Sequence, residues 1–223
     1  MLVAPIGDSA LALRRVALEP GDSSTLADPD LDSLLYVVAG TGLVALDGSE
    51  HTLRARCAAL VVAGEEAAIT SGDGMEVVVA TVRPEADRHA PLGPREVVVS
   101  LDDADPQDAS GARSFQILFG PHNGSTRATL FAGFVPPGKA PWHYHLYDEI
   151  VWVPEGPARL HIGETTAELE AGSAFRLRPR QVHIVENPSA ARELTILGVF
   201  TPAGSPSAAY LTPDVAAEYR FAG

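Results

Sequence analysis

The sequence predicts an all-β protein with two similar parts in tandem, and two observations support this. Short runs of β-branched and aromatic residues follow one another along the chain, and no long stretch has helical periodicity. Gly, Pro, Asp and Asn separate these runs at short intervals, which is typical of antiparallel sandwiches and barrels. The second observation is an internal repeat, which indicates two units of the same kind.

In chain order, the expected strands cover residues 34–38, 43–46, 59–62, 76–79, 96–99, 115–119, 129–131, 149–153, 159–162 and 194–197. The pairs Asp47–Gly48 and Asn123–Gly124 are hairpin-turn signals, because both central residues of the favoured turn need positive φ. Near the C-terminus, Thr212 as N-cap, Pro213 at the first helical position and Asp214 in the first turn predict a short terminal helix.

The internal repeat rests on shared spacing and apolar pattern, since few residues are identical. A shift of 116 residues lays residues 36–40 on residues 152–156. The Pro-rich, polar stretch 84–94 between the halves is the natural linker. We therefore expect an N-terminal domain over residues 1–90 and a C-terminal domain over residues 91–223.

Charge and hydropathy disfavour several classes of function. A net charge of −13 repels phosphate backbones, so nucleic acids and anionic membranes are not expected partners. No apolar run is long enough for a transmembrane helix, and the N-terminal residues lack the pattern of a signal peptide. The lone Cys57 excludes an intramolecular disulfide and fits a reducing compartment, so a cytoplasmic location is expected.

Two segments in the second half of the chain carry residues that bind metals. His143 and His145 are two residues apart, so on a strand they point to the same face, and Glu149 opens the next strand. His183 follows in the segment 172–187. Three imidazoles and one carboxylate satisfy most of the coordination sphere of one divalent transition metal, such as Fe, Mn, Ni, Co or Zn, and leave positions open.

These segments resemble the paired signature motifs of the cupin superfamily. Residues 138–156 match the first motif, G-x(4-5)-H-x-H-x(3)-E-x(6)-G, at every fixed position. In the second motif, His183 and Asn187 fall on their columns, whereas Arg178 and Arg180 replace a proline and a glycine. The resemblance implies a bicupin with two tandem jelly-roll barrels, in which His183 reaches the metal from across the second barrel.

The same offset indicates that the first half lacks the metal ligands. At this offset, the positions in the first half that correspond to the four candidate ligands are occupied by Ala27, Pro29, Ser33 and Ala67. None of these residues binds a transition metal well. The intact motif is therefore expected only in the C-terminal barrel. The first barrel is expected to have a structural role, standing where the second subunit of a single-cupin dimer would stand. A homodimer of the whole chain is a further expectation.

Two residues near the motifs are candidates for binding a small-molecule substrate. Strand alternation turns Arg176 and Arg178 away from the barrel interior if their apolar neighbours face it. This leaves Arg180, in the turn, to hold a substrate carboxylate. Tyr147 could donate a hydrogen bond to an oxygen atom at the metal. The alternative for the arginines is a solvated strand face and a salt-bridged turn.

The leading hypothesis is a metal-dependent enzyme acting on a small molecule that bears a carboxylate or other oxygen atoms. Within that class, the resemblance implies a dioxygenase similar to quercetinase-like cupins, with a redox-neutral lyase, isomerase or cyclase as the alternative. A non-catalytic binding or sensing module is the second class, since a fold alone does not establish function. Because imidazoles must be neutral to bind a metal, metal affinity is expected to fall as the pH drops below about 6.5.

Overall fold

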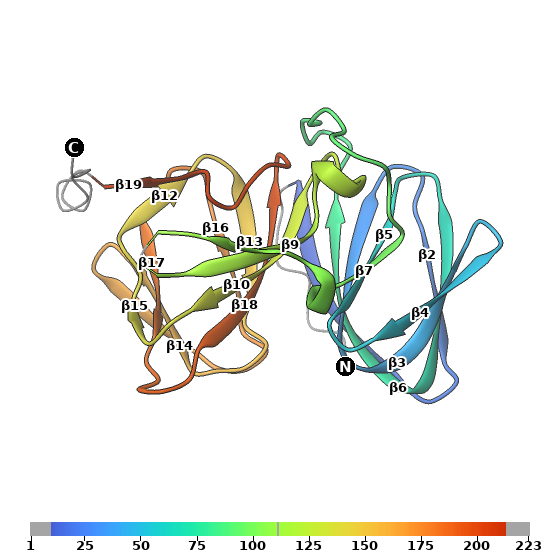
Figure 1. The fold of residues 1–223 in the computed structure, drawn as a ribbon, viewed down its shortest axis with the longest axis horizontal. Helices are drawn as coiled ribbons and strands as arrows, with labels where there is room; N and C mark the ends of the chain where they lie inside the picture. The colour runs from blue at the N-terminus through green and yellow to red at the C-terminus, as the bar shows by residue number, and fades with distance from the viewer. Residues whose placement is uncertain (1–9, 111, 213–223) are drawn as a thin grey trace. The chain divides into compact units, whose positions relative to one another are not determined.

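Strands form nearly all the regular secondary structure of the described chain (Figure 1). The computed structural model describes residues 10–110 and 112–212. Within these residues, the helices are two single turns of 3-10 helix, η1 (Leu101–Asp103) and η2 (Pro121–Asn123), and no helix is long enough to span a membrane. The predicted all-β class is confirmed, whereas the terminal helix predicted after Thr212 lies outside the described residues.

The first barrel is built around two long strands, β3 and β6. Its strands are β1 (Leu11–Leu18), β2 (Ser23–Ala27), β3 (Asp32–Leu46), β4 (Ser49–Arg54), β5 (Cys57–Val61), β6 (Glu66–Val82) and β7 (Val98–Ser100). They form one sheet in the order β1-β6-β3-β5-β7, with β2 beside β6 and β4 beside β3. Their inner faces bury a continuous apolar core that includes Leu35, Val37, Val44, Ile69 and Val77.

Strand β3 joins two runs that the sequence suggests as separate strands, because glycine lets the chain bend between them. Gly40 has φ +84°, and a Cβ atom there would lie 1.9 Å from the carbonyl oxygen of Gly74 on β6. The register between β3 and β6 shifts around this point. At the end of β3, Asp47 and Gly48 both have positive φ, which confirms the predicted hairpin turn.

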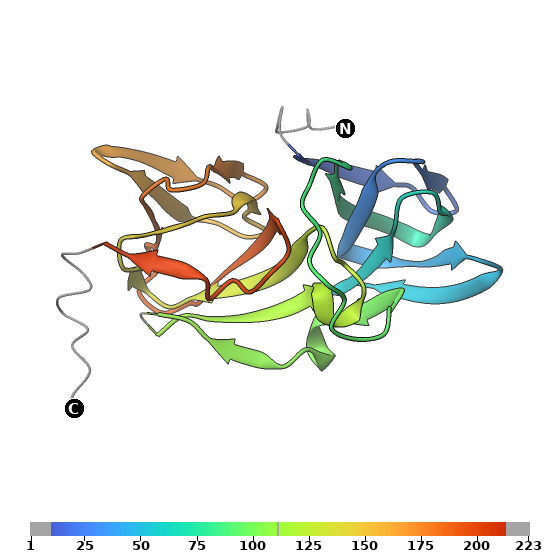
Figure 2. The same cartoon turned by 90° about the horizontal axis from the view of Figure 1, so that it is seen from above.

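The second barrel consists of two sheets (Figure 2). One has the order β16-β13-β18-β10-β9-β8, and the other has the order β15-β14-β17-β12-β19 with β11 beside β17. The strands are β8 (Pro106–Asp108), β9 (Ser114–Phe119), β10 (Thr129–Val135), β11 (Gly138–Lys139), β12 (His143–His145), β13 (Asp148–Trp152), β14 (Ala158–Ile162), β15 (Thr165–Leu169), β16 (Ala174–Leu177), β17 (His183–Asn187), β18 (Leu194–Thr201) and β19 (Ala209–Leu211). Both sheets contribute to one apolar core, for example Val151 and Phe175 from the first and Leu160 and Val185 from the second.

The strands of the two barrels recur at the offset found in the sequence. Strand β3 begins at Asp32 and β13 at Asp148, while β4 begins at Ser49 and β15 at Thr165. The long strand β6 spans the positions of β17 and of the first part of β18. The tandem architecture predicted from the apolar spacing is therefore confirmed.

The Asn123–Gly124 pair lies between the neighbouring strands β9 and β10, as predicted, but it does not form the predicted tight hairpin turn, because of the two residues only Gly124 has positive φ. Asn123 ends η2, and Gly124, with φ 107°, follows it in the connection between β9 and β10. The side-chain amide of Asn123 donates to the carbonyl of Leu118 (2.8 Å), and its oxygen accepts from the N–H of Gly120 (2.9 Å). The buried Asn123 therefore ends the 3-10 turn. Gly124 caps this turn, and its positive φ lets the chain change direction after it.

The two compact units are not continuous in sequence. One comprises the described parts of residues 1–105, 117–130 and 199–204, and the other those of residues 106–116, 131–198 and 205–223. The expected linker lies in residues 83–97, which have no regular secondary structure. The expected boundary near residue 90 therefore divides the sequence repeat but does not divide the two compact units. Residues 91–105, 117–130 and 199–204 come after this boundary and still pack with the first unit.

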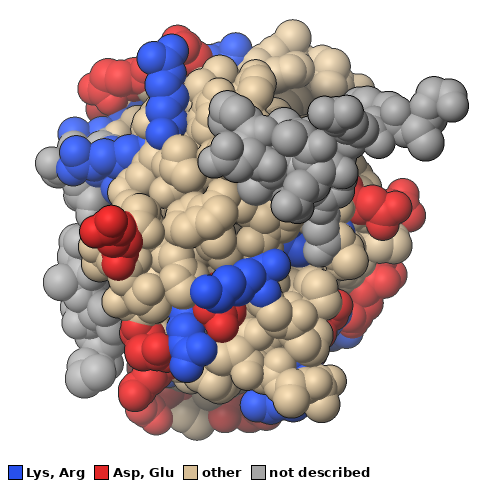
Figure 3. All heavy atoms as spheres, turned by 90° about the vertical axis from the view of Figure 1, so that its left-hand side faces the viewer, with Lys and Arg blue, Asp and Glu red and all other residues tan. Residues whose placement is uncertain are grey.

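Basic side chains of the second unit lie beside acidic ones. Arg159 contacts Glu168 at 2.6 Å and Glu186 at 3.2 Å, and Arg176 contacts Asp148 at 2.8 Å. On the face that Figure 3 shows, described Lys and Arg side chains likewise lie beside Asp and Glu side chains, among uncharged ones. Arg176 therefore forms the salt-bridged strand face considered for the motif arginines, through a partly buried two-point contact with Asp148.

Candidate metal centre

The four candidate ligands come from three strands of the second barrel. His143 and His145 lie on β12, Glu149 on β13 and His183 on β17. His143 and His183 are directly opposite each other in the β12–β17 pair. All four side chains are buried, whereas Tyr144, on the other face of β12, is only half-buried. Strand alternation thus turns both histidines of the first motif into the barrel.

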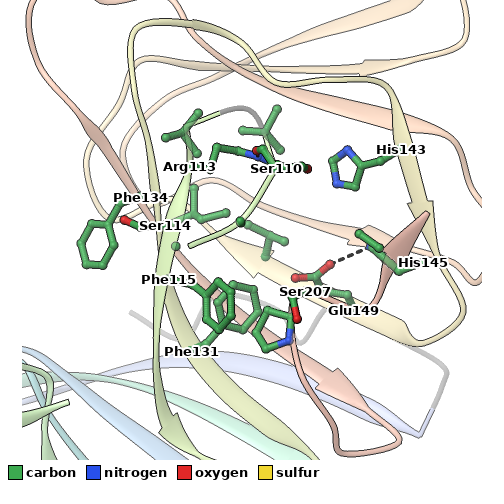
Figure 4. Close-up of a pocket in the computed structure, with 18 of the residues that line it drawn as sticks. Ser110, Arg113, Ser114, Phe115, Phe131, Phe134, His143, His145, Glu149 and Ser207 are labelled. Atoms are coloured by element: carbon green, nitrogen blue, oxygen red, sulfur yellow. Dashed lines mark hydrogen bonds and ion pairs between the residues drawn. The ribbon is translucent and has the colours of Figure 1, made fainter. Parts of the chain in front are cut away.

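The rings and the carboxylate lie close together. The ring centroids of His143 and His183 are 4.3 Å apart, and those of His145 and His183 are 5.0 Å apart. Nε2 of His145 lies 2.8 Å from Oε2 of Glu149 (Figure 4). Among residues 10–110 and 112–212, no three or more His, Cys, Asp and Glu side chains are arranged tightly enough to hold an ion as they stand. Coordination by these four is therefore a proposal that rests on their chemistry.

The same pattern of hydrogen bonds fixes the tautomer of each imidazole. Nδ1 of His143 lies 2.8 Å from the carbonyl oxygen of Pro141, and Nδ1 of His183 lies 2.8 Å from that of Gln181. Nδ1 of His145 lies 3.1 Å from the carbonyl oxygen of Tyr147. A carbonyl oxygen can only accept a hydrogen bond, so each neutral ring carries its proton on Nδ1. Each Nε2 is then left with a lone pair, as a metal ligand requires.

His145 and Glu149 pass a further test of fit. Nε2 of His145 is buried and has no hydrogen-bond partner, although Oε2 of Glu149 lies 2.8 Å away. The contact is short but lacks hydrogen-bond geometry, and the Nδ1–H tautomer puts two lone pairs face to face. A shared cation would satisfy both atoms. Two ligands each about 2.1 Å from one ion and at a right angle are about 3.0 Å apart, close to this separation.

The ligands open into a cavity of about 290 Å³ within the second barrel (Figure 4). This volume lies at the lower end of the range for small-molecule sites. Much of the remaining wall is apolar. It is formed by Phe115, Phe131, Val135, Val151, Leu177, Val185, Ile196 and Leu211. A small ligand in this cavity would therefore have access to the candidate ligands and contact an apolar wall.

Burial keeps two of the histidines neutral. It lowers the pKa of His143 to about 3, with a further contribution from the positive charges of His183 and Arg113. Burial also lowers the pKa of His183 to about 4, helped by the positive charge of Arg113. At these two ligands, protons therefore compete with a metal only at a pH well below the value of about 6.5 expected from the sequence.

These shifts predict a pH dependence of stability in metal-free protein. Because the folded pKa values of His143 and His183 lie below the unfolded value of 6.5, the unfolded chain binds more protons between pH 6.5 and 4. The free energy of unfolding should fall by on the order of a few kcal/mol as the pH drops through this window. Urea unfolding at several pH values measures it. The double variant His143→Gln/His183→Gln should show a shallower slope, and an unchanged slope would refute this attribution.

Gly198 on β18 leaves the space in which the Glu149 carboxylate lies. A Cβ atom at position 198 would lie 2.8 Å from Oε1 of Glu149 and 2.3 Å from a ring carbon of Phe131. Any side chain there would displace the carboxylate or the aromatic ring. The glycine is therefore needed for close packing, and it fixes the depth at which Glu149 enters the site.

Tyr147 lines the cavity, whereas Arg180 does not. The Tyr147 ring stacks on His145 at 4.1 Å, and its hydroxyl donates to the carbonyl of Pro206 (3.4 Å). The Arg180 side chain is exposed. Its backbone adopts φ 66°, and its N–H donates to the carbonyl of His145 (2.7 Å). Arg180 thus keeps the left-handed turn that a glycine in this motif column would form, and supports β12 through its backbone.

The arginine that does line the cavity is Arg113, which was not among the residues predicted from the sequence. It lies in the connection between β8 and β9, just before Ser114, and is half-buried. Strand alternation near the motifs carries no information about this connection. Ser110 and Ser114 also line the cavity. The only feature of the sequence that could have indicated this part of the site is the short run of small polar residues around Arg113.

Comparisons with known proteins agree on the fold. Residues 131–200 match the family model of the cupin domain. The structure is similar to AerE from Microcystis aeruginosa, with a TM-score of 0.73 and 14% identity over 88% of this chain and 90% of that one. It is also similar to the oxalate decarboxylase of Lactobacillus farciminis in a formate complex, with a TM-score of 0.75 and 16% identity over 94% and 81% of the chains.

A third similar structure is the Bacillus subtilis oxalate decarboxylase, described for its Mn(II) centres. Its TM-score is 0.76, with 15% identity over 96% of this chain and 74% of that one. No curated protein sequence matches the chain. At such low identities the similarities establish the fold alone, which is that of tandem cupin barrels.

Proposed function

We propose that this protein is a metal-dependent enzyme acting on a small molecule that bears a carboxylate or other oxygen atoms. The observation that carries the proposal is the anchoring of all three imidazoles through Nδ1 to backbone carbonyls, which leaves three Nε2 lone pairs beside a buried carboxylate. Histidines in an ordinary core have no reason to share this tautomer. Metal-binding histidines do, because the hydrogen bond at one nitrogen fixes the other for the ion.

His143, His145, Glu149 and His183 would hold one divalent transition metal. The mixed nitrogen and oxygen set suits Fe, Mn, Ni, Co or Zn, and the Mn(II) centres of a protein with the same fold support including manganese. Such an ion supplies Lewis acidity and a template that orients the substrate.

The remaining residues of the cavity bind, orient and exclude water. Burial raises the pKa of Tyr147, and the negative charge of Glu149 raises it further, so its hydroxyl stays protonated and acts as a hydrogen-bond donor. The apolar wall around Val151 and Leu177 keeps water from the reacting atoms and strengthens electrostatic interactions inside the cavity.

We also propose that the first barrel has a structural role. Ala67 on β6 pairs with Leu26 on β2, as His183 pairs with His143 in the second barrel. The residue that corresponds to His143 is therefore Leu26, one position before the Ala27 expected from the sequence. Both residues are apolar, so the first barrel lacks a metal ligand at this position in either case. Leu26 and Ala67 are both buried in the apolar core, so this interior is filled by packing.

Elemental analysis and oxygen uptake test the proposed function. Protein purified without chelators should contain about one equivalent of a transition metal, as one four-residue ligand set implies. Uptake of oxygen with an organic carboxylate under Fe(II) or Ni(II) would identify a dioxygenase, which is the first expectation. Turnover without oxygen uptake would identify a redox-neutral lyase, isomerase or cyclase. A metal-free protein, or a metal-loaded one that only binds carboxylates, would contradict the enzymatic proposal and leave a binding module.

A further inference from the structure

We propose that Arg113 binds the carboxylate of the substrate, and that the substrate is a small monocarboxylate with an apolar body. The inference rests on the proposed function, because it names the substrate class of the same site. It differs from the sequence expectation in two ways: the arginine is Arg113 instead of Arg180, and the rest of the molecule is aromatic or branched aliphatic instead of rich in oxygen.

Arg113 is held in place beside the cavity. Its Nε donates to the carbonyl oxygen of Ser110 (2.9 Å), and its Nη2 donates to the Ser110 hydroxyl (2.8 Å). Figure 4 shows the side chain extending from the β8–β9 connection toward Ser110 and the part of the cavity that carries His143. A guanidinium whose orientation is fixed in this way loses little further freedom when it binds a planar carboxylate.

The charge of Arg113 faces the same cavity as the candidate ligands. Arg113, His143 and His183 all line it. Among the described residues that line the cavity, Arg113 is the one with a permanent positive charge. The acidic ones are Glu149, whose charge a bound metal would offset, and Asp108, which is exposed. In a chain with a net charge of −13, a basic group facing this cavity favours an anionic ligand.

The apolar part of the cavity wall fits an apolar body. Phe115 and Phe131 line the cavity with their rings edge to face, 6.4 Å apart. Val135, Val151 and Ile196 continue the same surface. A small dianion such as oxalate would leave most of these side chains uncovered. A ring or a branched chain would instead remove apolar surface from water. The apolar wall therefore favours a monocarboxylate with an apolar body over oxalate.

Calorimetric titration of metal-reconstituted protein tests the inference with three probes: phenylacetate, its uncharged isostere phenylacetamide, and oxalate. Phenylacetate should bind more tightly than oxalate. In Arg113→Gln, affinity for phenylacetate should fall more than about tenfold, because a charge-assisted contact is lost, while affinity for phenylacetamide should change less than about threefold. Arg178→Gln removes an exposed arginine outside the cavity lining and should leave all three affinities unchanged.

The outcomes separate this inference from the proposed function. Equal loss of phenylacetate and phenylacetamide binding in Arg113→Gln, tighter binding of oxalate than of phenylacetate, or a loss seen in Arg180→Gln instead would overturn it. Absence of phenylacetate binding to the wild-type protein would also overturn it. If the wild-type protein binds no metal but phenylacetate affinity still depends on Arg113, the enzymatic proposal fails and the assignment of Arg113 stands.

Discussion

Glu149→Gln and His145→Ala are each expected to weaken the binding of a divalent transition metal by more than about 100-fold. Loss of a residue that only orients a metal ligand already costs about 10- to 100-fold, and these substitutions remove a ligand itself. Glutamine keeps the shape of the Glu149 side chain but removes the negative charge that faces Nε2 of His145 at 2.8 Å. The affinity should fall without a comparable loss of packing.

The measurement is the metal content after reconstitution with Mn(II), Fe(II) or Zn(II) and removal of the excess ion. Far-UV circular dichroism of each variant checks that the fold is retained. His122→Ala is the matched control, because His122 is an exposed histidine on η2, outside the cavity lining. A Glu149→Gln protein that retains a full equivalent of metal would show that the ligand set is wrong. So would loss of metal from the His122 variant to the same degree.

The candidate ligands could be predicted because local rules determine them. His143 and His145 are two residues apart on one strand, so alternation alone puts them on one face. His183 is different, because no local rule brings it opposite His143. Its place followed from resemblance to a two-motif family, and the β12–β17 pairing now provides the structural reason. The hydrogen bonds from Nδ1 go to carbonyl groups two residues from each histidine, just outside the strand that carries it. Their geometry depends on how the backbone turns there, which the spacing of residues in the sequence does not reveal.

The substrate side of the site was much harder to predict. Arg180 was selected because it lies in the motif turn, but a turn residue with positive φ can point its side chain to solvent while its backbone supports the strand. Arg113 comes from the connection before β9, and only the three-dimensional fold brings that connection to the cavity. Similarly, residues 34–38 and 43–46 were predicted as separate strands, whereas both belong to β3, which bends at Gly40.

Asp32→Ala is expected to lower the free energy of unfolding by about 3–5 kcal/mol, the range for breaking a buried ion pair by removing one partner. Asp32 and Arg127 are both buried, with Oδ1 and Nη1 3.0 Å apart, and the same oxygen accepts the N–H of Ala63 at 2.9 Å. Arg127 already has a buried Nε without a hydrogen-bond partner. Removing the carboxylate would leave its whole charge uncompensated in a medium of low polarity.

The repeat provides the matched control, because Asp148 begins β13 as Asp32 begins β3. Asp148 pairs with Arg176, whose side chain is 21% exposed, against 7% for Arg127, so the charge left by Asp148→Ala can reach water and the loss should be smaller, about 1–2 kcal/mol. Scanning calorimetry is the suitable measurement, since both tryptophans, Trp142 and Trp152, lie in the second unit and report little on the first. The double variant Asp32→Ala/Arg127→Met should recover most of the loss, because it removes the stranded charge together with its partner. Equal destabilisation by the two single variants would mean that the loss does not come from burial of the charge.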